Sequence, residues 1–186
     1  PEVQMPGGPV VFAGDLIQAH QTGCAFVKQS AMRPVSAPFD IVVTSNSGYP
    51  LDLNLYQGVK GLSTGARIVK PGGTLILACE CREGVPPNSP YDKLLRAAAN
   101  PEAILRRLAE SNTVVPEQWQ AQIQALVQRQ AKVLLYSSLS DEVIRACHLT
   151  PCRDIAAAVR ERLAGLGPEA RVAVLPWGPL TIPYIL

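Results

Sequence analysis

Apolar residues along this chain alternate between two patterns. Continuous runs rich in Val, Ile and Leu are typical of strands buried on both faces of a sheet, and they occupy residues 10–14, 41–45, 74–79, 133–137 and 171–175. The segments between them carry apolar residues three and four positions apart, which predicts amphipathic helices. This order predicts an α/β fold: a single domain with a mostly parallel five-stranded sheet and helices on both faces, in a Rossmann-like three-layer arrangement.

Polar residues predict where the helices begin. Asp15 is expected to cap a helix that runs to about Ser30, and either Asp52 or Asn54 a helix that runs to about Val69. The same reasoning predicts helices over 91–100, 101–111, 116–132, 141–148 and 150–165.

Proline and glycine predict the irregular segments. Residues 32–39 and 80–90 are expected to be loops, and the tail 176–186, with three prolines, has no predicted element. Residues 1–9 are expected to be a linker that precedes the domain at 10–186.

Composition excludes several classes of partner. Of the 186 residues 47% are hydrophobic and 17% charged, and the net charge is +2 without a basic run, which argues against a nucleic-acid partner. The longest apolar runs are far shorter than the ~20 residues of a membrane span, so no membrane partner is predicted. Five cysteines at irregular spacing argue against a disulfide scaffold and favour a reducing, cytoplasmic location.

The densest chemistry lies where the predicted strand 41–45 passes through a polar loop into the next helix. Open α/β sheets bind ligands at such carboxyl ends of strands, and the free N–H groups of a helix start favour an anion. Tyr56, Gln57 and Lys60 can share one face at this helix start, where a lysine beside an amide suits a small carboxylate or hydroxy acid. The alternative is an ordinary capped surface helix with a half-buried tyrosine and a solvated lysine.

Other chemistries find little support. The only two histidines, His20 and His148, are far apart in sequence, and the spacing of Cys79 and Cys81 is wrong for a zinc site. No glycine-rich phosphate loop follows a predicted strand. Trp119 stands between two glutamines near the start of a predicted helix, where it is either a core anchor or a lid over a ligand.

Residues 48–60 form a specific pattern, Gly-Tyr-Pro-x-Asp-x-x-x-Tyr-Gln-x-x-Lys. Together with Val-Phe-Ala-Gly-Asp-Leu-Ile-Gln-Ala-His at 11–20, Val-Lys-Pro-Gly-Gly-Thr-Leu-Ile-Leu at 69–77, Pro-Glu-Gln-Trp-Gln-Ala-Gln at 116–122 and the closing Pro-x-Gly-Pro-x-Thr-Ile-Pro, it resembles the C-terminal domain of the nickel-pincer lactate racemase family. One departure is Ser47, where the family pattern has glycine. We expect a change in backbone freedom there, because serine avoids positive φ.

The resemblance implies that the full-length protein is an isomerase, a racemase or epimerase of 2-hydroxy acids, with lactate as the default substrate. In the family, the nickel of a pyridinium-dithiocarboxylate nucleotide accepts a hydride from the α-carbon and returns it to either face. The residues that bind this cofactor and the nickel, and the catalytic histidine pair, belong to the family's N-terminal domain. The chain begins with Pro1 instead of Met, and we expect it to lack that domain, to contain no cofactor-binding or metal-ligating residue, and to be inactive alone.

The resemblance also implies roles for residues of this chain. Lys60 and Gln57 are expected to be catalytic residues in the C-terminal wall of the substrate cleft, with Lys60 on the substrate carboxylate. Tyr56, Trp119 and Tyr49 are expected to bind substrate from the same wall. The predicted partners are a small 2-hydroxy acid and the protein's own N-terminal domain. The alternative is a non-catalytic carboxylate-binding or interaction module on the same fold.

Overall fold

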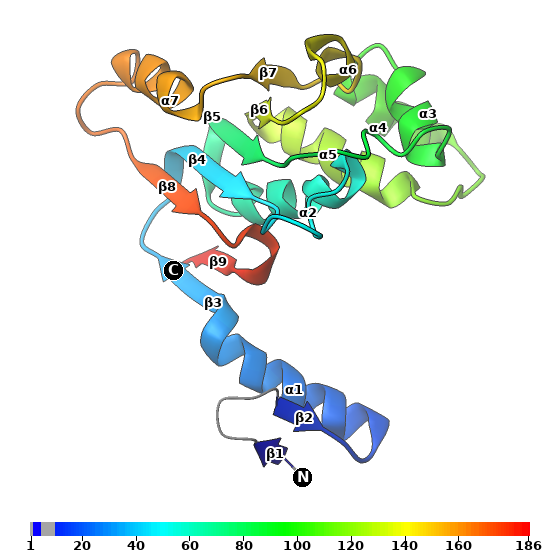
Figure 1. Cartoon of the computed structure of the whole chain (residues 1–186), viewed down its shortest axis with the longest axis vertical. Coiled ribbons are helices and arrows are strands. Elements are labelled where there is room, and N and C mark those ends of the chain that lie inside the picture. The colour runs from blue at the N-terminus through cyan, green and yellow to red at the C-terminus, as the bar shows by residue number, and fades with distance from the viewer. Residues whose placement is uncertain (1, 5–9) are drawn as a thin grey trace.

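Five parallel strands form the central sheet, in the order β7–β6–β5–β4–β8 (Figure 1). The computed structural model describes residues 2–4 and 10–186 of the chain. In chain order the strands are β4 (Phe39–Ser45), β5 (Val69–Ala78), β6 (Lys132–Tyr136), β7 (Thr150–Cys152) and β8 (Val172–Leu175).

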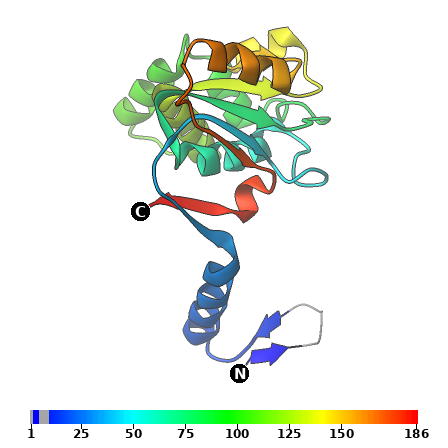
Figure 2. The same cartoon turned by 90° about the vertical axis from the view of Figure 1, so that its left-hand side faces the viewer.

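Helices cover both faces of this sheet, as the sequence predicts (Figure 2). On one face the larger core receives side chains from α2 (Leu55–Ala66), α3 (Pro90–Arg96), α4 (Pro101–Glu110), α5 (Gln118–Gln130) and α6 (Asp141–Ala146). The opposite face carries α7 (Ile155–Ala164), which packs on a smaller cluster of Ile41, Ile76, Leu134 and Cys152. The predicted three-layer α/β architecture is therefore confirmed.

The membership of the sheet differs from the prediction in one strand. Val10–Phe12 (β2) is not in it, and instead pairs antiparallel with Glu2–Gln4 (β1). Thr150–Cys152, predicted to open a helix, is the edge strand β7, and the helix begins only at Ile155. Pro151 is tolerated there because an edge strand has one side without ladder hydrogen bonds.

A second pair of short strands also lies outside the predicted elements. Met32–Val35 (β3), predicted as a loop, pairs in parallel with Ile182–Ile185 (β9), which lies in the tail that had no predicted element. A short 3₁₀ helix, η1 (Gly178–Leu180), leads into β9. Prolines in β3 and β9 obscure the strand pattern in the sequence, since proline is confined to edges and bulges in sheets.

The chain has two visibly different parts. We call residues 10–31, that is β2 and α1 (Leu16–Ala31), the arm, and residues 32–186 the body. The arm projects away from the body on the side of the sheet where α2 and β9 lie (Figures 1 and 2). The predicted cap of α1 is confirmed, since Asp15 Oδ1 accepts hydrogen bonds from the N–H groups of Ile17 and Gln18.

Close packing joins α2 to the sheet. Leu55, Val59 and Leu62 are completely buried. A Cβ atom at Gly61 would lie 2.5 Å from the carbonyl oxygen of Ser45, a distance that real side chains do not tolerate. Glycine therefore lets the helix that carries the predicted site approach β4 directly.

Asp40 ties three strands together at the amino end of the sheet. Its carboxylate accepts a hydrogen bond from the backbone N–H of Arg171 at 2.9 Å and one from Lys70 Nζ at 2.7 Å. These two donors, the backbone N–H first, lower the pKa of Asp40. The charged carboxylate thus stabilises the junction of β4 with β5 and β8.

Three further predictions concern the whole chain. In the part of the chain that the structure describes, no helix is long and apolar enough to cross a membrane. All five cysteines are free thiols. The predicted linker at 1–9 lies outside the described residues, except for Glu2–Gln4, which form β1.

Candidate functional site

The loop between β4 and α2 is held by its own polar side chains. Asn46 donates to the carbonyl oxygen of Leu51, and its Oδ1 accepts from the N–H of Gly61 at 3.2 Å. Ser45 Oγ donates to the carbonyl oxygen of Pro176 at 2.5 Å. These contacts fix the loop both to α2 and to the segment that follows β8.

Ser47 takes the backbone conformation of a glycine. Its φ is +67°, next to +73° at Gly48, and its N–H donates to Ser45 Oγ at 2.9 Å. Serine therefore adopts here the left-handed conformation that glycine allows in the family pattern, while the expected change of backbone freedom stays a prediction. A left-handed serine costs about 1–2 kcal/mol, and the hydrogen bonds of the loop offset this cost.

The first turns of α2 present a joined lysine and glutamine. Asn54, one of the two predicted caps, accepts from the N–H of Gln57 at 3.1 Å. Lys60 Nζ donates to Gln57 Oε1 at 2.6 Å, and Lys60 is exposed. Lys60 forms no ion pair with an acidic side chain among the described residues. An ammonium group has three donors, so two of them remain for an anion.

The start of α5 supports this turn from the side. Gln120 is buried, and its Nε2 donates to the backbone carbonyl oxygen of Tyr56 at 2.6 Å. The Tyr56 ring meets the buried Tyr91 ring edge-on at 5.5 Å between centroids, and burial, then Glu117, raise the pKa of Tyr56. Trp119 is 52% exposed, which argues against the core-anchor alternative.

Gln120 and Lys60 also share a small surface cavity of about 290 Å³, together with Pro179 of η1. Three segments far apart in sequence therefore converge beside the predicted lysine. Sequence reasoning missed Gln120, although its neighbour Trp119 was singled out, because a glutamine in a helix carries no local sign of its tertiary partner.

Tyr49 lies apart from the lysine and glutamine pair. It is 69% exposed, and the guanidinium carbon of Arg82 lies 5.1 Å from the centroid of its ring. Arg82 in turn pairs with Glu80 at 2.9 Å. Among the described residues no hydrogen bond or cation–π contact joins Tyr49 or Trp119 to Lys60. Of the five predicted residues, the structure thus joins Gln57 and Lys60 by a hydrogen bond, and Tyr56 lies in the same turn of α2.

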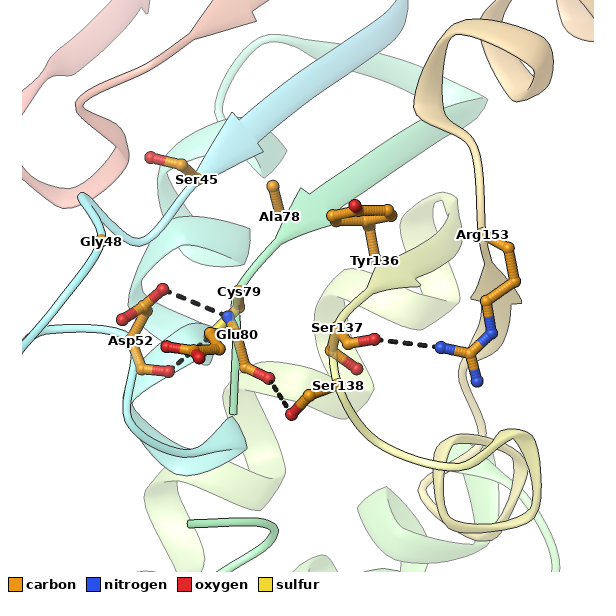
Figure 3. A pocket seen from close by; sticks show the side chains of 10 residues that line it. All are labelled: Ser45, Gly48, Asp52, Ala78, Cys79, Glu80, Tyr136, Ser137, Ser138 and Arg153. Atoms are coloured by element: carbon orange, nitrogen blue, oxygen red, sulfur yellow. Dashed lines mark hydrogen bonds between the residues drawn. The ribbon is translucent and has the colours of Figure 1, made fainter. Parts of the chain in front are cut away.

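A second and larger cavity, of about 610 Å³, opens at the carboxyl ends of β4, β5 and β6 (Figure 3). The chain leaves β6 toward the face of α6 and leaves β7 toward the face of α7. Open α/β sheets bind ligands where connections diverge in this way. Hydroxyl groups, two carboxylates and a guanidinium line the cavity, from Ser45, Asp52, Glu80, Ser137, Ser138 and Arg153. The signal that sequence reasoning missed is the serine pair directly after an apolar strand.

Asp52 of the family pattern links two segments beside this larger cavity by hydrogen bonds. Its Oδ2 accepts from the N–H of Glu80 at 3.2 Å, and its backbone carbonyl accepts from the N–H of Cys81 at 2.9 Å. Asp52 Oδ1 is buried without a hydrogen-bond partner among the described residues. Buried polar atoms are nearly always paired, so this oxygen is an exception beside the wall of the cavity.

Two buried cysteines near the cavity, Cys81 and Cys147, are held as thiols. The Sγ atoms of Cys79 and Cys81 are 3.4 Å apart and buried. The hydrogen bond to Cys79 and burial raise the pKa of Cys81, and burial raises the pKa of Cys147 to about 12. Protonated thiols are poor nucleophiles and poor metal ligands. No group of three or more His, Cys, Asp or Glu among the described residues could hold a metal ion, so these residues do not fit a nickel centre.

Comparison with known proteins decides the family. Residues 35–182 match the family described as lactate racemase C-terminal domain. The chain belongs to this family. The resemblance inferred from the motifs at 48–60 and elsewhere is therefore confirmed.

Two curated relatives are similar to this lactate racemase C-terminal domain over 90% of its length. They are the lactate racemases of Thermoanaerobacterium thermosaccharolyticum and Lactiplantibacillus plantarum, each 34% identical, over 171 and 170 residues. The structure of the lactate racemase apoprotein from T. thermosaccharolyticum superposes with a TM-score of 0.81 at 33% identity, over 89% of this chain and 40% of that one. The chain spans 39% and 40% of the length of the two curated relatives.

Proposed function

We propose that this chain is the C-terminal part of a 2-hydroxy-acid racemase and forms one wall of its substrate cleft. In this proposal Lys60 binds the substrate carboxylate and Gln57 holds the ammonium group in place. The family membership supports the reaction class, and the hydrogen bond between Lys60 and Gln57 carries the assignment of the site.

The geometry around Lys60 suits a carboxylate. The ammonium group is exposed, is oriented by a neutral oxygen at 2.6 Å, and has no competing acidic side chain among the described residues. A charged donor that keeps free N–H groups binds a carboxylate more strongly than a neutral donor does. Gln57 Nε2 offers a further donor for the substrate hydroxyl or carboxylate.

The aromatic residues complete the proposed wall. Trp119 and Tyr49 are exposed and would lose contact with water when substrate or another part of the protein closes over them. Tyr56 packs inward on Tyr91, so in this proposal it supports the turn that carries Lys60 as well as bordering the substrate.

The nickel-pincer nucleotide is assigned to the N-terminal part of the full-length protein, where it would supply the hydride acceptor. The described residues of the present chain offer no ligand set for nickel. Which 2-hydroxy acid is bound, and a cytoplasmic location, stay predictions.

The test is Lys60→Ala in the full-length protein, with racemisation of D- and L-lactate followed by chiral chromatography. Loss of a hydrogen bond to a charged group costs about 1.5–3 kcal/mol, so kcat/KM is expected to fall by about tenfold to a hundredfold. Most of the loss is expected in KM, because the proposed role is binding of the carboxylate.

Two variants control this experiment. Lys93→Ala removes an exposed lysine of α3 and is expected to leave kcat/KM unchanged. Lys60→Arg keeps the charge and is expected to retain part of the activity. Wild-type kcat/KM in Lys60→Ala would remove Lys60 from the site. A full-length protein that racemises no 2-hydroxy acid yet binds lactate through Lys60 would establish the binding-module alternative.

A further inference from the structure

The arm leaves an apolar surface uncovered. Of the sixteen residues of α1, only Ala31 is buried, and the exposed fractions of Leu16, Ile17 and Val27 are 83%, 64% and 49%. A solitary helix of this length is only marginally stable in water, and helices in proteins gain most of their stability from packing of an apolar face. The described residues of this chain therefore do not supply the packing that α1 needs.

The uncovered residues form one stripe along the helix. Ile17, His20, Cys24 and Val27 follow each other at spacings of three and four, and Leu16 lies four positions before His20, so the five residues share one side of α1. We call these five residues the α1 stripe. The α1 stripe contains no charged carboxylate or ammonium group. A helix face of this composition and spacing is typical of a helix that packs on another element.

Strand β2 packs on the neighbouring side of α1. The rings of Phe12 and Phe26 lie 5.5 Å apart, and Phe12 Cδ2 would meet a Cβ atom at Gly23 at 3.3 Å. Gly23 lies at the edge of the α1 stripe, and Phe26 lies beyond it. With the described residues of the hairpin in place the stripe itself stays exposed, so it is open to another partner.

We propose that the α1 stripe is the docking surface for the N-terminal part of the full-length racemase. This inference rests on the proposed function, because that part is the one assigned the nickel-pincer nucleotide. The relatives are more than twice as long as the matched region, and the family model of the C-terminal domain starts only at residue 35.

The matches to the relatives reach into the arm. The alignments with the relatives cover 90% of this chain. The family match ends at residue 182, and only four residues follow it, so the remaining aligned residues must lie before residue 35. At least the C-terminal half of α1 is thus shared with the two lactate racemases, and it lies outside the match to the C-terminal family model. The arm also projects on the side of the sheet where α2 lies, so a partner seated on it would be held toward the helix that carries Lys60 (Figure 2).

Cys24 provides a direct readout of this docking. It lies in the stripe and is exposed, whereas the other four cysteines are buried. Its alkylation by iodoacetamide, followed residue by residue by mass spectrometry, is expected to be at least about tenfold slower in the full-length protein than in the present chain.

A charged double variant tests the surface, with a matched control. Ile17→Glu with Val27→Lys places charges in the stripe, but an acid in the first turn and a base toward the C-terminal end favour the helix itself. Alkylation of Cys24 in this full-length variant is expected to return to the rate of the present chain. Gln18→Glu with Gln29→Lys puts the same charges on the polar side of α1 and is expected to leave Cys24 protected.

The outcomes separate this inference from the proposed function. Rapid alkylation of Cys24 in the unmodified full-length protein would overturn the docking surface, even if the protein is an active racemase. Protection of Cys24 that grows with concentration in the present chain would overturn it too, since a second copy would then be the partner. Protection in a full-length protein that racemises nothing would support the docking surface and refute the proposed reaction.

Discussion

Helices α1 and α2 begin alike and have opposite surroundings. Each starts after an acidic or amide side chain that accepts from the first free N–H groups, Asp15 for α1 and Asn54 for α2. Yet α2 buries Leu55, Val59 and Leu62 completely between the sheet and α5, whereas α1 buries only Ala31.

The difference separates helix formation from helix burial. A cap and a suitable periodicity act over about one turn and are present in both helices. Burial requires a surface from elsewhere in the chain. The sheet supplies this surface for α2, whereas the described residues supply none for most of α1. The two proposals follow the same division. The buried helix would hold Lys60 and Gln57 in a defined place, and the exposed helix would offer a surface to a partner.

The largest effect is expected when a leucine or isoleucine side chain of each helix is shortened to alanine in the present chain. Leu62→Ala removes a completely buried side chain of α2 and is expected to lower the free energy of unfolding by about 2–5 kcal/mol. Ile17→Ala in α1 is expected to change it by less than about 0.5 kcal/mol. Urea unfolding followed by circular dichroism measures both. Equal losses would show that α1 is packed as tightly as α2.

A matched pair of glycine substitutions gives a smaller effect. Gly61→Ala forces a Cβ atom to within 2.5 Å of the Ser45 carbonyl oxygen, and overpacking of this kind costs about 1–3 kcal/mol. Gly23→Ala meets only the ring of Phe12 at 3.3 Å and gains up to about 1 kcal/mol of helix propensity. The midpoints of thermal unfolding should therefore shift down for the first variant and stay level or rise for the second. A stable Gly61→Ala variant would refute the close approach of α2 to β4.

The smallest expected effect is on the pH dependence of the stability of the body, to which Asp40 belongs. The pKa of Asp40 is lowered in the folded chain, so its carboxylate stabilises the body above the ordinary pKa of 3.8, and this stabilisation is lost as pH falls through the lowered value. Asp40→Asn is expected to reduce the free energy of unfolding at neutral pH and to weaken its dependence on pH below about 4.

Urea midpoints between acidic and neutral pH measure this effect. Asp154→Asn, a change at the cap of α7, is the control for loss of any exposed carboxylate. An unchanged pH dependence in Asp40→Asn would show that the contacts with Arg171 and Lys70 do not contribute.

Much of the fold and part of the site could be predicted from local patterns. The alternation of strands and helices, the caps Asp15 and Asn54, and the spacing of Gln57 and Lys60 depend on residues within a turn or two of each other. For the same reason the motif at 48–60 was enough to indicate the family, which the match at 35–182 then confirmed.

The tertiary structure alone decided which segments meet. Local patterns placed Val10–Phe12 in the sheet and Thr150–Cys152 in a helix, but strand membership depends on a pairing partner, and β6 selected the second segment. The hydrogen bond from Gln120 to Tyr56 joins residues 64 positions apart and leaves no trace in the sequence around either.

The sequence by itself therefore determined the class of the fold, the family and the Gln57–Lys60 pair on one helix face, because each follows from neighbours along the chain. Only the tertiary structure decided that this helix is buried against the sheet while α1 stands exposed. Burial is a property of contacts between distant segments, and two helices with equally good local signals differ only in what the rest of the chain brings to them.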